Sequence, residues 1–302
     1  MSETQSIIAV RKGKSGVERT MNLLFLLCGL TAVVCVVFMT LYMVVAGGPI
    51  IAKVGFFDFV FGRTWNPENS QFGIFPMIVS SIAATGGAVL IALPCGVLVA
   101  VFLAKLAPDR IAAALRALID LLAGIPSVVY GLLGAILLVP LIFNLQTALR
   151  LPTSGNLLAA MLILVIMILP TIISVSETAI RAVPKEYEDA ALALGSTRLQ
   201  SIFKVSIPAA KSGIVAGIVL GTGRAIGEAM AVIMVAGNAA IMPTLLGPVR
   251  LLTTSIPIEW AYSSGTHRDA LYGIGLALFV MIMAINTIFR KTLKKGGAFD
   301  DG

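Results

Sequence analysis

The sequence predicts an all-helical integral membrane protein with six transmembrane helices. Hydrophobic residues make up 58% of the 302 residues and charged residues only 12%, whereas about 25% of an ordinary soluble domain is charged. The mean hydropathy is +0.99. Several apolar runs reach the roughly 20 residues that a helix needs to cross the hydrocarbon core. No water-soluble core could bury so much apolar surface, so a soluble protein is excluded.

Six apolar runs are candidates for transmembrane helices. The first follows basic residues, as a signal peptide does, but it is too long for a signal-peptide apolar region and no small-residue cleavage site follows it. The second and third contain Pro94, Pro126 and Pro140, which predicts bent or tilted helices. The six predicted spans are 22–47, 74–104, 115–145, 155–180, 211–236 and 271–290.

The lysine and arginine residues gather on one side of the predicted membrane. Sixteen of the 22 lie in the tails 1–21 and 291–302, at position 290 beside the second tail, in residues 105–116 after the second span, or in residues 181–211 after the fourth span. Five lie on the other side, and Arg224 lies within a span. The positive-inside rule therefore places both termini in the cytoplasm. A membrane topology accounts for the net charge of +7, so the expected surroundings are lipid, and no nucleic-acid partner is expected.

The two outer segments, 48–73 and 237–270, are predicted to be loops. Trp65 and Trp260 are expected to anchor them at the membrane interface, and His267 receives no role. The three cysteines have no disulfide or metal-site spacing and are interpreted as buried thiols. They are Cys28, Cys35 and Cys95.

The longest inner segment, from Arg181 to Gly213, reads RAVPKEYEDAALALGSTRLQSIFKVSIPAAKSG. Acidic residues come early in its first helical run, and negative charges stabilise a helix N-terminus. Gly195 ends that run. A second amphipathic run ends at Pro208. The pattern predicts a cytoplasmic helix–turn–helix over 181–210. Taken alone, it also fits an amphipathic connector that lies on the inner leaflet.

Part of this segment closely resembles the EAA signature of ABC importer permeases, E-A-A-x(3)-G-x(9)-I-x-L-P. The matching residues are Asp189, Ala190, Ala191, Gly195, Val205, Ile207 and Pro208. The departures are mild: Asp replaces Glu and has a shorter reach, Val replaces Ile, and Ile replaces Leu. In that family the loop forms a coupling helix that docks into a cleft on the ATPase subunit. The resemblance implies that docking is carried here by Glu188, Asp189, Ala190, Ala191, Gly195 and Pro208.

Three further stretches are similar to the PstC-type permeases of bacterial phosphate importers. They are IDLLAGIPSVVYG (Ile119–Gly131), MILPTIISVSETAIRAVP (Met167–Pro184) and GRAIGEAMAVIMVAGN (Gly223–Asn238). The sister PstA-type permeases depart from the last stretch after its GE. The resemblance covers most of the chain from about residue 73 onward. It implies a type I ABC importer permease-like core over 74–290, comprising five spans and the coupling loop, in the bacterial inner membrane.

The same resemblance implies a substrate and partners. The substrate is inorganic phosphate, moved inward by alternating access. The partners are a PstA-type sister permease, two PstB-type ATPase subunits and a periplasmic PstS-type phosphate-binding protein.

The sequence lacks an ATP-binding P-loop, which needs G-x-x-x-x-G-K-[ST]. Its closest fragment, GKS at Gly13–Ser15, has Ile8 where the first glycine is required. No spacing is typical of a metal site or a nucleophilic triad. The chain is therefore not expected to be an enzyme or to hold a cofactor, and ATP hydrolysis must come from a partner.

Two charged residues, Arg224 and Glu228, interrupt the fifth span within GTGRAIGEAMAV. On a continuous helix they share one face, and Arg224 lies about 16 Å into a ~30 Å hydrocarbon core. An unpaired charge there costs at least ~2.5–3.5 kcal/mol. A guanidinium can donate paired hydrogen bonds to phosphate, so we expect Arg224 in the substrate pathway, restrained by Glu228. The competing interpretation is an Arg–Glu pair that only locks neighbouring helices together.

Asp120 is the third candidate for the pathway. In the third predicted span it could partner Arg224 or a basic residue of the sister permease, or it could lie at the cytoplasmic boundary. Tyr130 is interpreted as a packing residue. Glu177 is expected at the inner end of the fourth span, either solvated or near Arg181.

Other functions compete with phosphate import. A permease for another oxyanion, such as phosphonate, sulfate or molybdate, is an alternative because a membrane arginine does not discriminate among oxyanions. An ATP-independent secondary transporter or channel would have no reason to carry an EAA-like loop. A structural scaffold is disfavoured by the charges within the membrane.

Overall fold

The computed structural model describes residues 16–150 and 155–295. The basic residues Arg11, Lys12 and Lys14, the GKS fragment and the tail from residue 296 onward lie outside the described residues.

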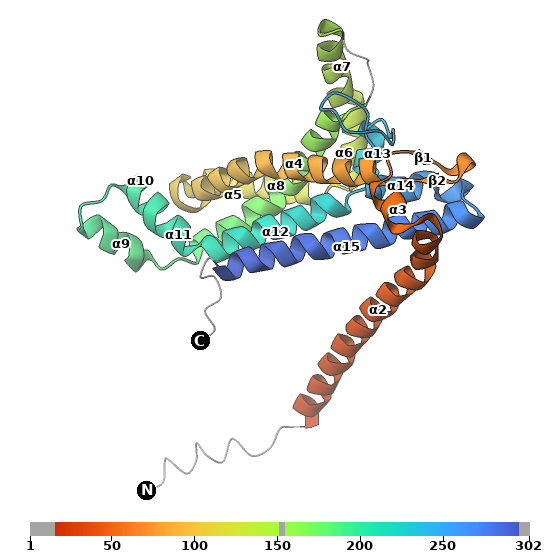
Figure 1. Cartoon of the computed structure of the whole chain (residues 1–302). Coiled ribbons are helices and arrows are strands. Elements are labelled where there is room, and N and C mark those ends of the chain that lie inside the picture. Colours follow the sequence, from red (N-terminus) through yellow and green to blue (C-terminus); the bar gives the residue numbers. More distant parts are fainter. Residues whose placement is uncertain (1–15, 151–154, 296–302) are drawn as a thin grey trace.

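Four long helices lie side by side in a bundle, and α2 joins this bundle at one end only (Figure 1). Buried alanine and branched aliphatic side chains fill the space between α4, α8 and α12. Ile50, near the end of α2, is 2% exposed and packs in a cluster with residues of α15. The bounds are α2 Gly16–Val54, α4 Phe75–Val101, α8 Leu157–Arg181, α12 Lys211–Gly227 and α15 Gly265–Lys295.

Within the described residues, five helices are long and apolar enough to cross a membrane. They are Glu18–Val54, Phe75–Leu106, Ser127–Ala148, Leu157–Arg181 and Gly265–Ile288. The sixth candidate is the pair Arg198–Ala209 and Lys211–Gly227, which is bent by 68°. The prediction of an all-helical membrane protein is confirmed. The first and last helices extend beyond the predicted runs 22–47 and 271–290.

The third predicted span, 115–145, is wrong as a single helix. Pro126 lacks an N–H group and disfavours a helical conformation in the residue before it. Ile125 accordingly has an extended backbone, with φ −70° and ψ 130°. A separate helix α5 therefore packs on α8, whereas α6 and α7 rise away from the bundle (Figure 1). The bounds are α5 Asp109–Gly124, α6 Ser127–Leu133, the π-helix η3 Gly134–Leu138 and α7 Val139–Ala148.

The outer segments contain more regular structure than the loops predicted for them. A small antiparallel hairpin pairs Trp65 with Phe72 and Asn66 with Gln71. Short helices cluster with this hairpin at one end of the bundle (Figure 1). The elements are α3 Phe56–Phe61, β1 Trp65–Asn66, the 3-10 helix η1 Pro67–Asn69, β2 Gln71–Phe72, α13 Met230–Val235, α14 Leu252–Glu259 and the 3-10 helix η5 Trp260–Tyr262.

The predicted helix–turn–helix lies at the opposite end of the bundle (Figure 1). It consists of α9 Lys185–Ala193, α10 Arg198–Ser201, the π-helix η4 Ile202–Ser206 and α11 Ile207–Ala209. A further π-helix, η2 Phe102–Leu106, continues α4 at this end.

Glycines let α12 approach α8 closely. Gly213, Gly217 and Gly221 recur at four-residue spacing, which places small residues along a helix contact. A Cβ atom at Gly217 would lie 3.1 Å from the Val175 Cβ, and one at Gly221 would lie 2.9 Å from the Ile172 Cγ1. Larger side chains at these positions would push the two helices apart.

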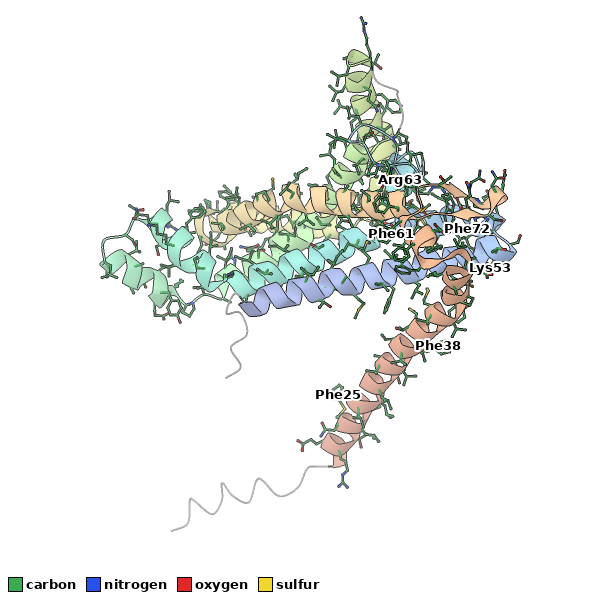
Figure 2. All side chains as sticks on the ribbon, viewed as in Figure 1. Phe25, Phe38, Lys53, Phe61, Arg63 and Phe72 are labelled. Atoms are coloured by element: carbon green, nitrogen blue, oxygen red, sulfur yellow. The ribbon has the colours of Figure 1, made fainter. Side chains whose placement is uncertain are left out.

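Many large apolar side chains are exposed on the surface of the protein. Phe25 and Phe38 on α2 are 67% and 70% exposed (Figure 2). The prediction of buried thiols is wrong, because Cys28, Cys35 and Cys95 are all exposed on the surface of this chain. Such surfaces fit a lipid environment or another membrane chain.

Candidate functional site

The fifth predicted span, 211–236, does not run as one helix through Arg224 and Glu228. Helix α12 ends at Gly227, and Glu228 has an extended backbone with φ −76° and ψ 124°. Helix α13 begins at Met230. The expectation that the arginine and the glutamate share a helical face is therefore wrong. Glycine disfavours a helix interior relative to alanine, so Gly227 suits the position of the break.

Arg224 lies beside an open face at the end of α12. Thr222, Ala225 and Ile226 are buried there, whereas Arg224 is half-buried. Gly223 and Gly227 lie next to it on the helix. A Cβ atom added to either glycine would have no neighbouring atom within 4 Å. No described residue forms a hydrogen bond or an ion pair with the Arg224 guanidinium. This chain thus leaves the charge available.

Glu228 closes the helix break instead of pairing with Arg224. Its Oε1 accepts a hydrogen bond from the Ala231 N–H at 2.9 Å, which satisfies one of the first N–H groups of α13. Its backbone carbonyl accepts a hydrogen bond from the Thr253 Oγ1 at 3.0 Å. The residue is therefore tied to both α13 and α14.

Tyr130 brings the start of the third membrane helix next to Arg224. Its hydroxyl donates to the Leu122 carbonyl at 2.6 Å, which satisfies one of the last carbonyls of α5. The Arg224 guanidinium lies within electrostatic range of this tyrosine. Because a Cβ at Gly131 would lie 2.8 Å from the Ala231 Cα, α6 also packs directly on α13.

Asp120 does not lie in a membrane span and does not pair with Arg224 in the described part of the chain. It is exposed on α5 and lines a cavity of about 380 Å³. Arg116 Nε and Arg181 Nε both donate to Glu177 Oε1 in this cavity, at 2.7 and 2.8 Å. Glu177 is 5% exposed. Of the two alternatives expected for Glu177, the position near Arg181 is therefore correct.

Sequence reasoning missed Arg116 as the second partner of Glu177. Both residues belong to helical runs, but nothing local to either run indicates that α5 folds back onto α8. The only local signal was the four-residue spacing of Glu177 and Arg181, which places them on one helix face.

The end of α9 presents an apolar, exposed turn. Leu192 and Leu194 are 42% and 89% exposed. Gly195 has φ +85°, and its N–H donates to the Leu192 carbonyl at 2.9 Å. The Ser196 N–H donates to the Ala191 carbonyl at 3.1 Å, which completes a Schellman motif. The left-handed glycine therefore determines where α9 ends.

Most of the predicted docking residues are accessible. The exposed ones are Asp189, Ala190, Gly195 and Pro208. Ala191 is half-buried and supplies a carbonyl to the turn.

Glu188, in contrast, is bound within the chain. It forms an ion pair with Lys105, and its side chain is 21% exposed. Its Oε1 also accepts a hydrogen bond from the Ser206 hydroxyl at 2.6 Å. Burial raises the pKa of this carboxyl, but hydrogen bonds from Lys105 and Ser206, together with the positive charges of Lys105 and Arg198, leave the pKa below its ordinary value.

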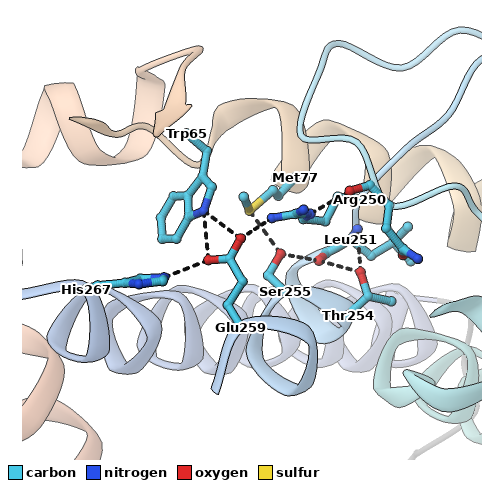
Figure 3. A network of polar contacts seen from close by, with 9 residues as sticks. Trp65, Met77, Arg250, Leu251, Thr254, Ser255, Glu259 and His267 are labelled. Carbon is cyan, nitrogen blue, oxygen red and sulfur yellow. Dashed lines mark hydrogen bonds and ion pairs between the residues drawn. The ribbon is translucent and has the colours of Figure 1, made fainter. Parts of the chain in front are cut away.

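Glu259 joins four segments at the end of the bundle that carries the hairpin (Figure 3). Its carboxylate accepts a hydrogen bond from Trp65 Nε1 at 2.9 Å and forms an ion pair with Arg250. His267 Nε2 lies 2.8 Å from Glu259 Oε2. The partners come from the hairpin, from the loop before α14 and from the start of α15. Trp65 and His267 therefore have internal partners that the sequence did not predict.

Comparisons with known proteins agree with this architecture. Residues 92–291 match the family described as "Binding-protein-dependent transport system inner membrane component". The probable ABC transporter permease protein YqgH of Bacillus subtilis is 35% identical over 288 residues, 93% of this chain and 92% of the relative. The phosphate transport system permease protein PstC of Pasteurella multocida is 35% identical over 251 residues, 78% of each chain.

Two solved ABC transporters share the fold. A chain of a bacterial alginate ABC transporter aligns with a TM-score of 0.65 at 16% identity, covering 92% of this chain and 96% of that chain. A chain of the MetNI methionine ABC transporter aligns with a TM-score of 0.59 at 18% identity, covering 77% and 99%.

Of the five long apolar helices in the described residues, the family match contains three in full and the last part of α4. It also contains the helix–turn–helix, and both relatives cover most of the chain. The chain belongs to the inner membrane components of binding-protein-dependent transport systems, which are permease subunits of ABC transporters.

Proposed function

We propose that this chain is the membrane subunit of an ABC importer for inorganic phosphate. The observation that carries the proposal is the 35% identity to a phosphate transport system permease protein, PstC, over 78% of both chains. The importer moves the anion inward by alternating access. The energy comes from ATP hydrolysis on a partner subunit.

The proposed assembly contains a PstA-type sister permease, two PstB-type ATPase subunits and a periplasmic PstS-type phosphate-binding protein. The exposed turn at Leu194 and Gly195 supports a docking role toward the ATPase, because an apolar side chain that is 89% exposed outside the membrane gains from being covered by a partner. The open face beside Arg224 supports a contact with the sister permease around a shared pathway.

Arg224 is the proposed phosphate contact in that pathway. Its guanidinium has no partner among the described residues, and an unpaired charge within a membrane is costly. A phosphate ion would supply oxygen acceptors in the fork geometry that arginine favours. Glu228 and Asp120 remain proposed members of the pathway, with Glu228 shaping the break next to the arginine.

The proposed location is the bacterial inner membrane, with both termini in the cytoplasm. The distribution of lysine and arginine supports this orientation. A single cysteine at position 198, in a variant without the three native cysteines, should resist an impermeant thiol reagent added to intact cells. A cysteine at position 65 should react once the outer membrane is permeable, and labelling of position 198 from outside would reverse the orientation.

Co-purification and uptake test the proposed function. The affinity-tagged chain, extracted from native membranes, should retain an ATPase and a second permease. Proteoliposomes that contain this complex, with the binding protein outside, should accumulate radioactive phosphate only when ATP is enclosed inside, on the side of the ATPase. Transport of sulfate, phosphonate or molybdate in place of phosphate would assign a different oxyanion, and uptake without ATP would reject an ABC importer.

Arg224→Gln should lower phosphate uptake by roughly ten- to a hundredfold, because charge-assisted hydrogen bonds contribute about 1.5–3 kcal/mol. The complex should still assemble. Arg224→Lys keeps the charge but loses the bidentate fork, so uptake should be intermediate.

Glu228→Gln is the matched comparison. Its amide oxygen can still accept from the Ala231 N–H, so assembly should persist while turnover changes. Near-normal uptake by an Arg224→Gln, Glu228→Gln double variant would contradict a role in the pathway.

Gly195→Trp should prevent docking of the ATPase or uncouple it, because a large side chain is added to the exposed turn and any side chain is strained at φ +85°. Gly195→Asn is the control, since asparagine tolerates the left-handed region better than other residues. Retention of the ATPase on the tagged complex and ATP-dependent uptake are the measurements. Normal uptake by Gly195→Trp would argue against this turn as the docking site.

A further inference from the structure

The inner end of α4 is held by the segment that follows α8. We name residues 181–209 the coupling segment. The Arg181 guanidinium donates to the Leu103 carbonyl at 2.7 Å. Farther along the coupling segment, Arg198 donates to the Lys105 carbonyl at 2.9 Å. The Lys105 side chain itself forms the ion pair with Glu188. Three polar contacts thus converge on two residues of one helix end, Leu103 and Lys105.

The conformation of this helix end explains why it receives arginines. Residues 102–106 form a π-helix, closed by a hydrogen bond from the Ala107 N–H to the Phe102 carbonyl at 2.7 Å. The last carbonyls of a helix lack intrahelical donors and carry the negative end of the helix dipole. Guanidinium groups from the coupling segment satisfy these carbonyls. Short π-helical stretches are often found at functional sites.

Apolar packing reinforces the polar contacts. Leu103, Ile180 and Ile202 are at most 1% exposed and belong to one buried cluster. The cluster therefore includes the end of α4, the end of α8 and the coupling segment. Close-packed interiors transmit displacement because they have few voids.

Direct contacts continue from α4 to the helix that carries Arg224. A Cβ at Gly96 on α4 would lie 2.8 Å from the Ile172 Cγ2. On its other side, Ile172 lies against Gly221 of α12. One side chain of α8 is thus wedged between α4 and α12.

We propose that Lys105 and Glu188 join the coupling segment to the inner end of α4, so that the two move as one body during transport. Helix α4 then carries the displacement of the coupling segment into the membrane core. Lys105 and Glu188 are positioning residues, since neither contacts the substrate. This inference rests on the proposed function, because the displacement originates at the ATPase.

Charge variants test the link in proteoliposomes that contain the whole transporter. Lys105→Gln and Glu188→Gln should leave ATP hydrolysis largely intact but lower the phosphate moved per ATP by about tenfold, a typical coupling magnitude. The charge-swapped double variant, Lys105→Glu with Glu188→Lys, should recover most of this ratio. Arg110→Gln removes an exposed positive charge nearby and should change nothing. A normal ratio in both single variants, or no recovery in the swap, would overturn the proposal.

A covalent link gives a second test that does not depend on how the single variants assemble. Lys105→Cys with Glu188→Cys, in a variant without the three native cysteines, is joined by a short bis-maleimide. Before treatment this variant lacks the ion pair and should show the lowered ratio of phosphate moved per ATP. If the two segments move as one body, the cross-link should restore most of that ratio. Arrest of uptake by the cross-link would show that the segments separate during the cycle. Absence of ATP-dependent phosphate uptake in the unmodified complex would instead reject the proposed function itself.

Discussion

The close contact between α12 and α8 is the constraint on which the rest of the membrane core depends. Gly217 and Gly221 bring the two helices together without intervening side chains. That contact fixes which side of α12 is buried and leaves Gly223 and Gly227 open beside Arg224. Arg224 therefore lies at an open face of α12 because Gly217 and Gly221, on a neighbouring side of the same helix, pack against α8.

Polar groups at the two ends of the bundle follow a common physical rule. A buried charge is stable only when partners satisfy it, and each end supplies those partners from distant parts of the chain. At the outer end Glu259 gathers an indole, a guanidinium and an imidazole. At the inner end Glu177 receives two arginines, and Glu188 receives Lys105. Arg224 has no such partner among the described residues, and the proposed phosphate contact would supply one.

The polar contacts at the two ends of the bundle join different kinds of segment. The outer network ties short helices and a hairpin to the start of α15 and stabilises a cap over the bundle. The inner contacts connect an exposed turn, centred on Gly195, to the end of a membrane helix. Packed side chains of one buried cluster connect this turn's segment with the ends of α4 and α8, which is the connection that the proposed coupling requires.

The sequence by itself determined the membrane class, the approximate spans, the charge asymmetry and the helix–turn–helix whose first helix ends at a glycine. These features depend on hydropathy, periodicity and capping, which are properties of neighbouring residues. Only the tertiary structure decided that Glu228 closes a helix break, that α5 is separate from the third span, and that Lys105 meets Glu188. Such outcomes depend on how helices pack and where the backbone finds hydrogen-bond partners, and residues far apart in the chain supply both.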